Sequence, residues 1–132
     1  MAEIRDIDIL GSNYQIIYVQ SEEEKRENYP HLIGCYGILL STSKTILIMA
    51  YNDDIVGYTD EEGGIERNWK PLMKSSLRHE IIHAYLNECG LRFCAKGTND
   101  ESWSRNEEMV DWIACLSPKI FKTFKELDIL DE

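Results

Sequence analysis

The order of hydrophobic and polar residues predicts strands in the first half of the chain. Residues 14–20 (YQIIYVQ) are rich in β-branched and aromatic side chains, which favours a strand. Two short hydrophobic runs, CYGILL and TILIMAY, follow within 35–51 and are separated by the polar segment STSK. This pattern predicts a β-hairpin with a four-residue connection. Residues 3–10 alternate only loosely, and the charged segment 21–28 predicts an exposed helical turn or loop.

A helix is predicted between Pro71 and Gly90. Proline suits the first position of a helix, glycine suits the position just past its end, and neither residue occurs between these two. At about 100° per residue, hydrophobic side chains fill a broad arc of this helix. They are Leu77, Ile81, Ile82, Ala84, Tyr85 and Leu86. His79, Glu80 and His83 occupy the rest of the circle, with the two histidines one turn apart on one face.

A second helix is predicted in the segment SRNEEMVDWIACLSP, with Pro118 just past its end. Hydrophobic residues at helical spacing give it an apolar face. They are Met109, Val110, Trp112, Ile113 and Leu116. Its start is open. SRNE at 104–107 fits a capping box, which would make Glu107 a helix-start residue and no ligand, whereas TNDE at 98–101 fits an earlier capping box that would put Glu107 in mid-helix.

Composition and charge limit the kinds of protein and partner that the sequence is compatible with. The 132 residues are 43% hydrophobic and contain no repeat or linker, so a single globular domain over 1–132 is expected. A formal charge of −10 argues against a nucleic-acid partner, because phosphate binding needs a basic patch. We expect a cytoplasmic protein without membrane association, since no secretory signal or spanning hydrophobic run is visible. The four cysteines form no CxxC pair and are expected to be small buried side chains.

His79, Glu80 and His83 form the pattern HExxH. Zinc binds imidazole nitrogens at about 2.0–2.1 Å in a tetrahedral array, and histidines four residues apart on a helix present two nitrogens to one point. Glu80 lies too far round the helix to be a third ligand, but it can reach a metal-bound water and take its proton. We therefore predict a Zn²⁺ site with Glu80 as the catalytic base. Because so short a motif also arises by chance, a third ligand is needed.

Glu107 and Asp111 share one edge of the second predicted helix. A glutamate there could complete the ligand set, and an aspartate one turn later could accept the other N–H of a ligand histidine and so fix the orientation of its ring. Periodicity does not separate Glu107 from Glu108, so either of them, or neither, could be the ligand. His31 follows a proline far upstream, and a surface histidine is the better interpretation there.

HEIIH, followed about 24 residues later by NEEMVD, resembles the gluzincin metallopeptidases, in which a downstream glutamate of an NExxxD helix completes the HExxH site. Within that group, EEMVDWIACLSP is similar to the ExxAnxFAxxLLxP segment of the ImmA/IrrE-like metallopeptidases of bacteria and their phages. Ala114 matches that segment and Pro118 is matched to its terminal proline, two positions early, whereas Val110 and Ile113 stand where the family has alanine and phenylalanine. The resemblance covers about residues 35–118 and implies Glu107 as the third ligand.

The resemblance leaves one role open. The oxyanion-stabilising residue of the family has three candidates here, Tyr36, Tyr85 and His31. We also expect no fused DNA-binding domain and little room for an elaborate substrate cleft.

These patterns together predict an α+β minimal zincin-like domain. A small β-sheet that includes the hairpin within 35–51 should pack on the HExxH helix, with the second, Glu-bearing helix crossing beneath the metal. The predicted function is that of a zinc metallopeptidase, an endopeptidase that acts on a protein or peptide, with Glu80 moving the proton from water to the leaving amine. The strand TILIMAY is expected at the sheet edge, where it would bind an extended peptide.

Two other interpretations are retained. One is a non-catalytic zinc-binding interaction module on a zincin scaffold, in which His31 or Cys94 closes the site as a fourth ligand. The other is a zinc-free helical domain in which the motif has no chemical role.

Overall fold

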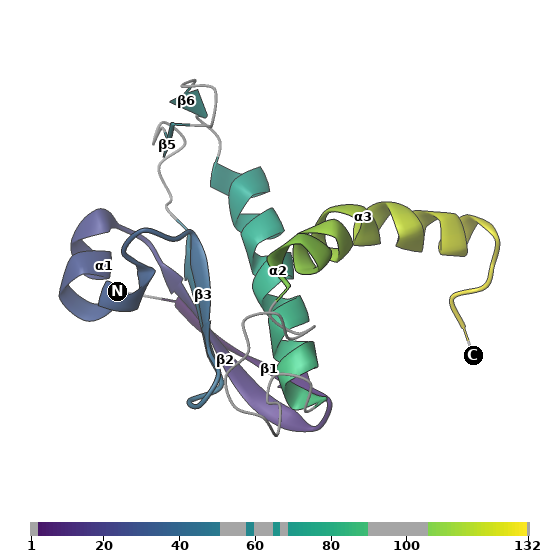
Figure 1. The fold of residues 1–132 in the computed structure, drawn as a ribbon, viewed down its shortest axis with the longest axis horizontal. Helices are drawn as coiled ribbons and strands as arrows, with labels where there is room; N and C mark the ends of the chain where they lie inside the picture. Colours follow the sequence, from purple (N-terminus) through teal and green to yellow (C-terminus); the bar gives the residue numbers. More distant parts are fainter. Residues whose placement is uncertain (1–2, 51–57, 60–64, 67–68, 90–105, 132) are drawn as a thin grey trace.

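The computed structural model describes residues 3–50, 58–59, 65–66, 69–89 and 106–131. Within these ranges the fold is α+β, with one helix packed on a mixed four-stranded sheet and a second long helix packed on the first (Figure 1). None of the helices described is both long enough and apolar enough to cross a lipid bilayer.

The sheet has the strand order β1-β2-β4-β3. Its strands are β1 (Glu3–Ile9), β2 (Ser12–Val19), β3 (Gly37–Leu40) and β4 (Thr45–Met49). β1 and β2 are antiparallel, β2 and β4 are parallel, and β3 and β4 are antiparallel. A separate short pair is formed by β5 (Tyr58–Thr59) and β6 (Ile65–Glu66).

The loosely alternating segment at the start of the chain forms β1, which pairs with β2 from Glu3↔Tyr18 to Ile9↔Ser12. Leu10 and Gly11 connect the two strands with φ angles of 50° and 89°, the left-handed backbone that two-residue hairpin turns require. Only Ile9 of β1 is buried, because β1 is an outer strand. The segment therefore shows only weak alternation of hydrophobic and polar residues, although all seven residues of Glu3–Ile9 form a strand.

The hairpin predicted within 35–51 is confirmed, since β3 and β4 are antiparallel and the four residues 41–44 connect them. The prediction that TILIMAY is an edge strand is wrong. β4 lies between β2 and β3, and four of its five residues are buried. The outer strand on this side of the sheet is β3.

The charged segment after β2 forms a short helix, α1 (Glu22–Asn28), with no buried residue. Ser21 caps it, because its Oγ accepts a hydrogen bond from the backbone N–H of Glu24 at 3.1 Å. A 3-10 turn, η1 (Pro30–Leu32), follows and buries Leu32. α1 and η1 lead the chain from β2 to the start of β3.

Helix α2 (Trp69–Glu88) covers one face of the sheet, and it begins two residues before Pro71. Ala84 belongs to the core between helix and sheet, and Leu77 and Ile81 pack against that core. The buried members of this core are Ile9, Tyr14, Ile16, Ile46, Ile48 and Ala84. Tyr85, which the sequence places in the apolar arc, is 43% exposed and does not pack against this core.

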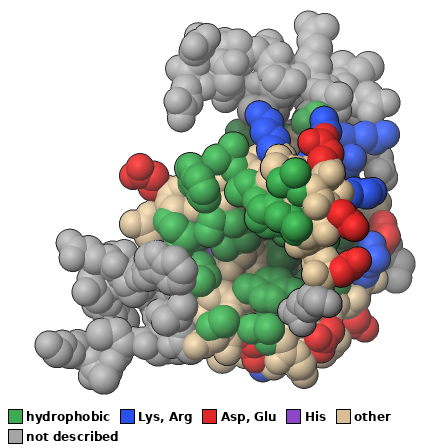
Figure 2. Space-filling model, turned by 90° about the vertical axis from the view of Figure 1, so that its right-hand side faces the viewer, with side chains coloured by type: hydrophobic (Ala, Val, Ile, Leu, Met, Phe, Trp, Pro, Cys, Tyr) green, Lys and Arg blue, Asp and Glu red, His purple; other side chains and the backbone are tan. Residues whose placement is uncertain are grey.

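Helix α3 (Glu107–Glu126) packs on α2 and then extends beyond it (Figure 1). The prediction that the helix ends before Pro118 is wrong, because Pro118 lies inside it. Val110 and Ala114 are buried, whereas Trp112 of the predicted apolar face is 58% exposed. Hydrophobic side chains gather on the face of the molecule from which α3 projects (Figure 2).

The cysteines differ from the prediction of small buried side chains. Cys89 and Cys115 are exposed and Cys35 is partly buried; all three are free thiols. Cys94, like the proposed capping box at 98–101 and Ser104, lies outside the described residues.

Candidate metal centre

His79 and His83 lie on consecutive turns of α2, and their side chains meet. The two Nε2 atoms are 3.1 Å apart, and the rings pack edge to face with centroids 4.7 Å apart. His83 is 9% exposed, so it is one of the few buried polar residues in the described part of the chain. The helical spacing of four residues thus brings both nitrogens to one point, as the sequence predicted.

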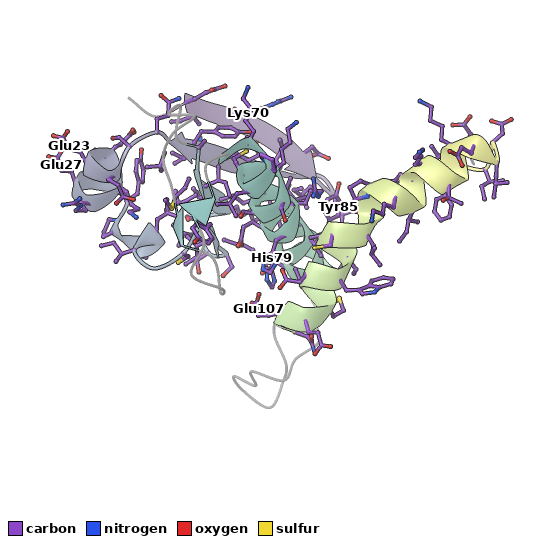
Figure 3. The ribbon with its side chains drawn as sticks, turned by 90° about the horizontal axis from the view of Figure 1, so that it is seen from above. Glu23, Glu27, Lys70, His79, Tyr85 and Glu107 are labelled. Atoms are coloured by element: carbon purple, nitrogen blue, oxygen red, sulfur yellow. The ribbon has the colours of Figure 1, made fainter. Side chains whose placement is uncertain are left out.

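Glu107 brings a carboxylate to the same point from α3. Its Oε2 lies 2.8 Å from Nε2 of His79, and its Oε1 lies 3.3 Å from Nε2 of His83. Figure 3 shows Glu107 at the start of α3 beside His79 of α2. The three residues form a group that could hold a metal ion, with one ligand atom from each and all of these atoms within 4.8 Å of one another.

These separations fit a small tetrahedral ion. Ligand atoms that lie 2.0–2.1 Å from zinc at tetrahedral angles are separated from each other by about 3.3 Å. With Oε2 as the ligand atom of Glu107, the three atoms of this group lie 2.8, 3.1 and 3.4 Å apart, close to that value. Two imidazole nitrogens and a carboxylate suit several first-row divalent metals, zinc among them.

Asp111 lies one turn after Glu107 and contacts the far side of the His79 ring. Its Oδ1 is 2.6 Å from Nδ1 of His79. The tautomer assigned from this contact has the proton on Nδ1, which leaves the lone pair of Nε2 facing His83 and Glu107. The predicted neighbours of the histidines on α3 are therefore both in contact with His79.

Glu80 is buried between α2 and β3, with 8% of the residue exposed. Burial raises the pKa of its carboxyl above the ordinary value, while the neighbouring His79 and His83 oppose that shift. The carboxylate also accepts a hydrogen bond from the backbone N–H of Leu39 in β3. Glu80 is thus held against β3, the outer strand of the sheet, and interacts electrostatically with His79 and His83.

Gly37 makes this close approach possible. A Cβ at position 37 would lie 3.2 Å from Cγ of Glu80 and 2.8 Å from Cδ1 of Ile48. The second distance is shorter than real Cβ contacts allow, so only glycine fits without displacement. Neither Gly37 nor Leu39 was singled out from the sequence, because their effect on Glu80 arises from packing between elements distant in the chain.

The start of α3 resolves the question of capping. The helix begins at Glu107, and Oδ1 of Asn106 accepts a hydrogen bond from the backbone N–H of Met109 at 2.8 Å. Asn106 is therefore the N-cap residue, whereas the two predicted capping boxes would place the N-cap at Ser104 or at Thr98. Glu107 is a helix-start residue and also contacts both histidines, because a first-turn side chain is free to project beyond the helix end.

The other residues considered from the sequence lie elsewhere. Glu108 is exposed and does not belong to the His79, His83 and Glu107 group. His31 is exposed in η1, as expected for a surface histidine. Tyr36 and Tyr85 are 39% and 43% exposed.

No protein-family model matches this sequence, and comparisons with curated proteins and with solved structures find no significant similarity.

Proposed function

We propose that this chain is a zinc-dependent metallopeptidase of the gluzincin type, similar to the ImmA/IrrE-like enzymes. His79, His83 and Glu107 would hold the ion, and Glu80 would be the general base. The observation that carries the proposal is the convergence of two Nε2 atoms and a carboxylate from two helices at separations of 2.8–3.3 Å. A cation is the simplest partner for lone pairs that converge in this way.

The exposure of the group favours a catalytic site over a closed structural one. Catalytic zinc sites use three protein ligands and keep one position open, whereas structural sites are closed by four. The side chain of Glu107 is 67% exposed, so the group has a side that faces solvent. When bound there, zinc would lower the pKa of a coordinated water and polarise a substrate carbonyl.

Glu80 would carry the proton. Its raised pKa, caused mainly by burial, brings the carboxylate closer to the working pH of a general acid–base catalyst. The Leu39 N–H orients the carboxylate by its hydrogen bond. Glu80 would accept a proton from the attacking water and deliver it to the nitrogen of the leaving amine.

The outer strand β3 would hold the substrate. β3 is the outer strand of the sheet next to Glu80, and outer strands bind extended peptides by adding them as a further strand. The scissile peptide bond would then lie along β3, close to the general base. This replaces β4, the strand proposed from the sequence, in that role.

Metal content and a Glu80→Gln variant test the proposal. Protein purified without chelator or histidine tag is expected to contain about one zinc per chain. Glu80→Gln should keep the zinc and lose cleavage of a diverse set of unstructured peptides, because the amide cannot accept the proton. Cleavage retained by this variant would contradict the general-base role. Zinc binding without cleavage by the wild type would favour the non-catalytic interaction module, and no zinc uptake would remove the site altogether.

A further inference from the structure

Pro118 leaves a backbone carbonyl of α3 without its usual donor. In an α-helix the carbonyl of residue 114 accepts the N–H of residue 118, but proline has no N–H. Ala114 is 1% exposed, so solvent is a poor substitute partner for this oxygen. Figure 3 shows that α3 changes direction near its middle, as helices do at a proline.

Arg78 of α2 supplies the hydrogen-bond donor that this carbonyl lacks. Its Nε–H donates a hydrogen bond to the Ala114 oxygen at 2.8 Å, in a partly buried position. A charged donor such as a guanidinium makes a stronger hydrogen bond than a neutral one. The bond therefore connects α2 to α3 at the point where the helix ladder of α3 is interrupted.

This bond lies next to the metal centre on both helices. Arg78 directly precedes His79 on α2, and Ala114 follows Glu107 by two turns and Asp111 by about one. Residues 107, 111 and 114 therefore share the side of α3 that faces α2. Anchoring this side to α2 sets how far along α2 the two carboxylates reach and how they are turned towards His79.

We propose that Arg78 is a positioning residue for the metal centre, acting through the Ala114 carbonyl, and that Pro118 is what makes this carbonyl available. The inference rests on the proposed function, because it concerns the alignment of the same ligand group. Arg78 itself contributes no ligand atom. Its effect is on the affinity and geometry of the site.

Two substitutions of similar size separate the donor from the rest of the side chain. In Arg78→Gln, Nε2 stands as many bonds from Cα as Nε does in arginine, so a donor is kept while the charge is lost. In Arg78→Met, a methyl group takes that place. We expect Arg78→Met to weaken zinc binding by about 10-fold or more, as loss of an outer partner of a metal site does, and Arg78→Gln to recover most of it. Lys74→Met, at an exposed position one turn earlier on α2, is the control for loss of charge.

Pro118→Ala tests the second half of the proposal. Alanine supplies the missing N–H to the Ala114 carbonyl, so Arg78→Met should cost less zinc affinity in the Pro118→Ala background than alone. The same background stabilises α3 by removing proline from its interior, which keeps the double variant folded. Equal losses in both backgrounds would overturn the role of Pro118.

The measurements are zinc affinity by competition with a chromophoric chelator and the visible absorption spectrum of the Co²⁺-loaded protein. Arg78→Met should change the Co²⁺ spectrum, and Lys74→Met should not. If Arg78→Met binds zinc as tightly as the wild type and gives the same spectrum, the inference is overturned while the zinc site stands. If the wild type binds no metal, the proposed function fails. Amide hydrogen exchange then tests the anchoring role of Arg78 by itself: faster exchange in α3 of Arg78→Met than in α3 of Arg78→Gln would support it, and equal exchange would overturn it.

Discussion

Oδ1 of Asp111 lies 2.6 Å from Nδ1 of His79, so a residue of α3 holds the ring of a residue of α2. The contact is on the side of the ring opposite the atom that faces Glu107. It therefore controls which nitrogen of His79 is free to bind a metal, and it joins the two helices at the same time. Carboxylate partners of this kind also make the ligand nitrogen more basic.

Removal of the Asp111 carboxylate should weaken metal binding without abolishing it. Asp111→Ala is expected to lower zinc affinity by about 10- to 100-fold, because the tautomer and ring orientation of His79 are no longer held. Asp111→Asn should be milder, since its amide oxygen still accepts the Nδ1 proton. Zinc affinity measured by chelator competition should fall from wild type to Asp111→Asn to Asp111→Ala. An alanine variant that binds zinc as tightly as the asparagine variant would contradict this prediction.

Glu107 and Glu108 offer a matched pair, because both are exposed first-turn glutamates of α3 and only Glu107 contacts the histidines. Glu107→Ala should lose most of the bound zinc, whereas Glu108→Ala should keep about one zinc per chain. Both variants remove one acid from the same helix turn, so their effects on the stability of α3 should be similar. Elemental analysis after dialysis is the measurement. Equal zinc content in the two variants would exclude Glu107 as a ligand.

The parts of the site that could be predicted from the sequence are those set by helical spacing. His79 and His83 converge because they lie four residues apart on one helix, and Glu107 and Asp111 reach the same ring because they have the same spacing on another. The β3–β4 hairpin was likewise a local pattern. Each of these spacings depends on residues close together in the chain, whereas the packing of α3 on α2 that brings Glu107 and Asp111 to His79 does not.

The parts that could not be predicted depend on contacts between distant segments. The position of β4 inside the sheet results from its parallel pairing with β2, which no local pattern encodes. The rule that proline ends a helix failed at Pro118, where Arg78 from another helix supplies the donor that the carbonyl lacks. The burial of Glu80 likewise depends on β3, more than forty residues earlier in the chain.

The end of α2 carries a polar network that should make stability depend on pH. Glu88 accepts hydrogen bonds from Ser12 and, at 2.6 Å, from the Tyr14 hydroxyl, and Lys44 Nζ lies 3.4 Å from its Oε1. These partners, Ser12 first, lower the pKa of Glu88 below its ordinary 4.5. A lowered native pKa contributes stability above the unfolded value, and this contribution is lost as the pH falls through the native value.

We therefore expect the wild type to lose unfolding free energy relative to Glu88→Gln as the pH falls from about 4.5 towards the lower native pKa. Urea unfolding of both proteins at a series of pH values is the measurement. Glu23→Gln, at an exposed position of α1, is the control for removal of one negative charge. A constant difference between wild type and Glu88→Gln over this range would show that the network does not stabilise the charged form.

A side chain at position 37 should destabilise the fold, because Ile48 of β4 and Glu80 of α2 both lie against Gly37. In Gly37→Ala the new Cβ would meet Cδ1 of Ile48 at 2.8 Å and Cγ of Glu80 at 3.2 Å. Ile48 is fully buried and cannot move freely, so we expect a loss of about 1–3 kcal/mol in the free energy of unfolding. Ile48→Val removes the atom that clashes, so the double variant Gly37→Ala/Ile48→Val should be more stable than the sum of the two single losses predicts. Additive losses in urea unfolding would mean that a side chain at position 37 does not press on Ile48 as this contact requires.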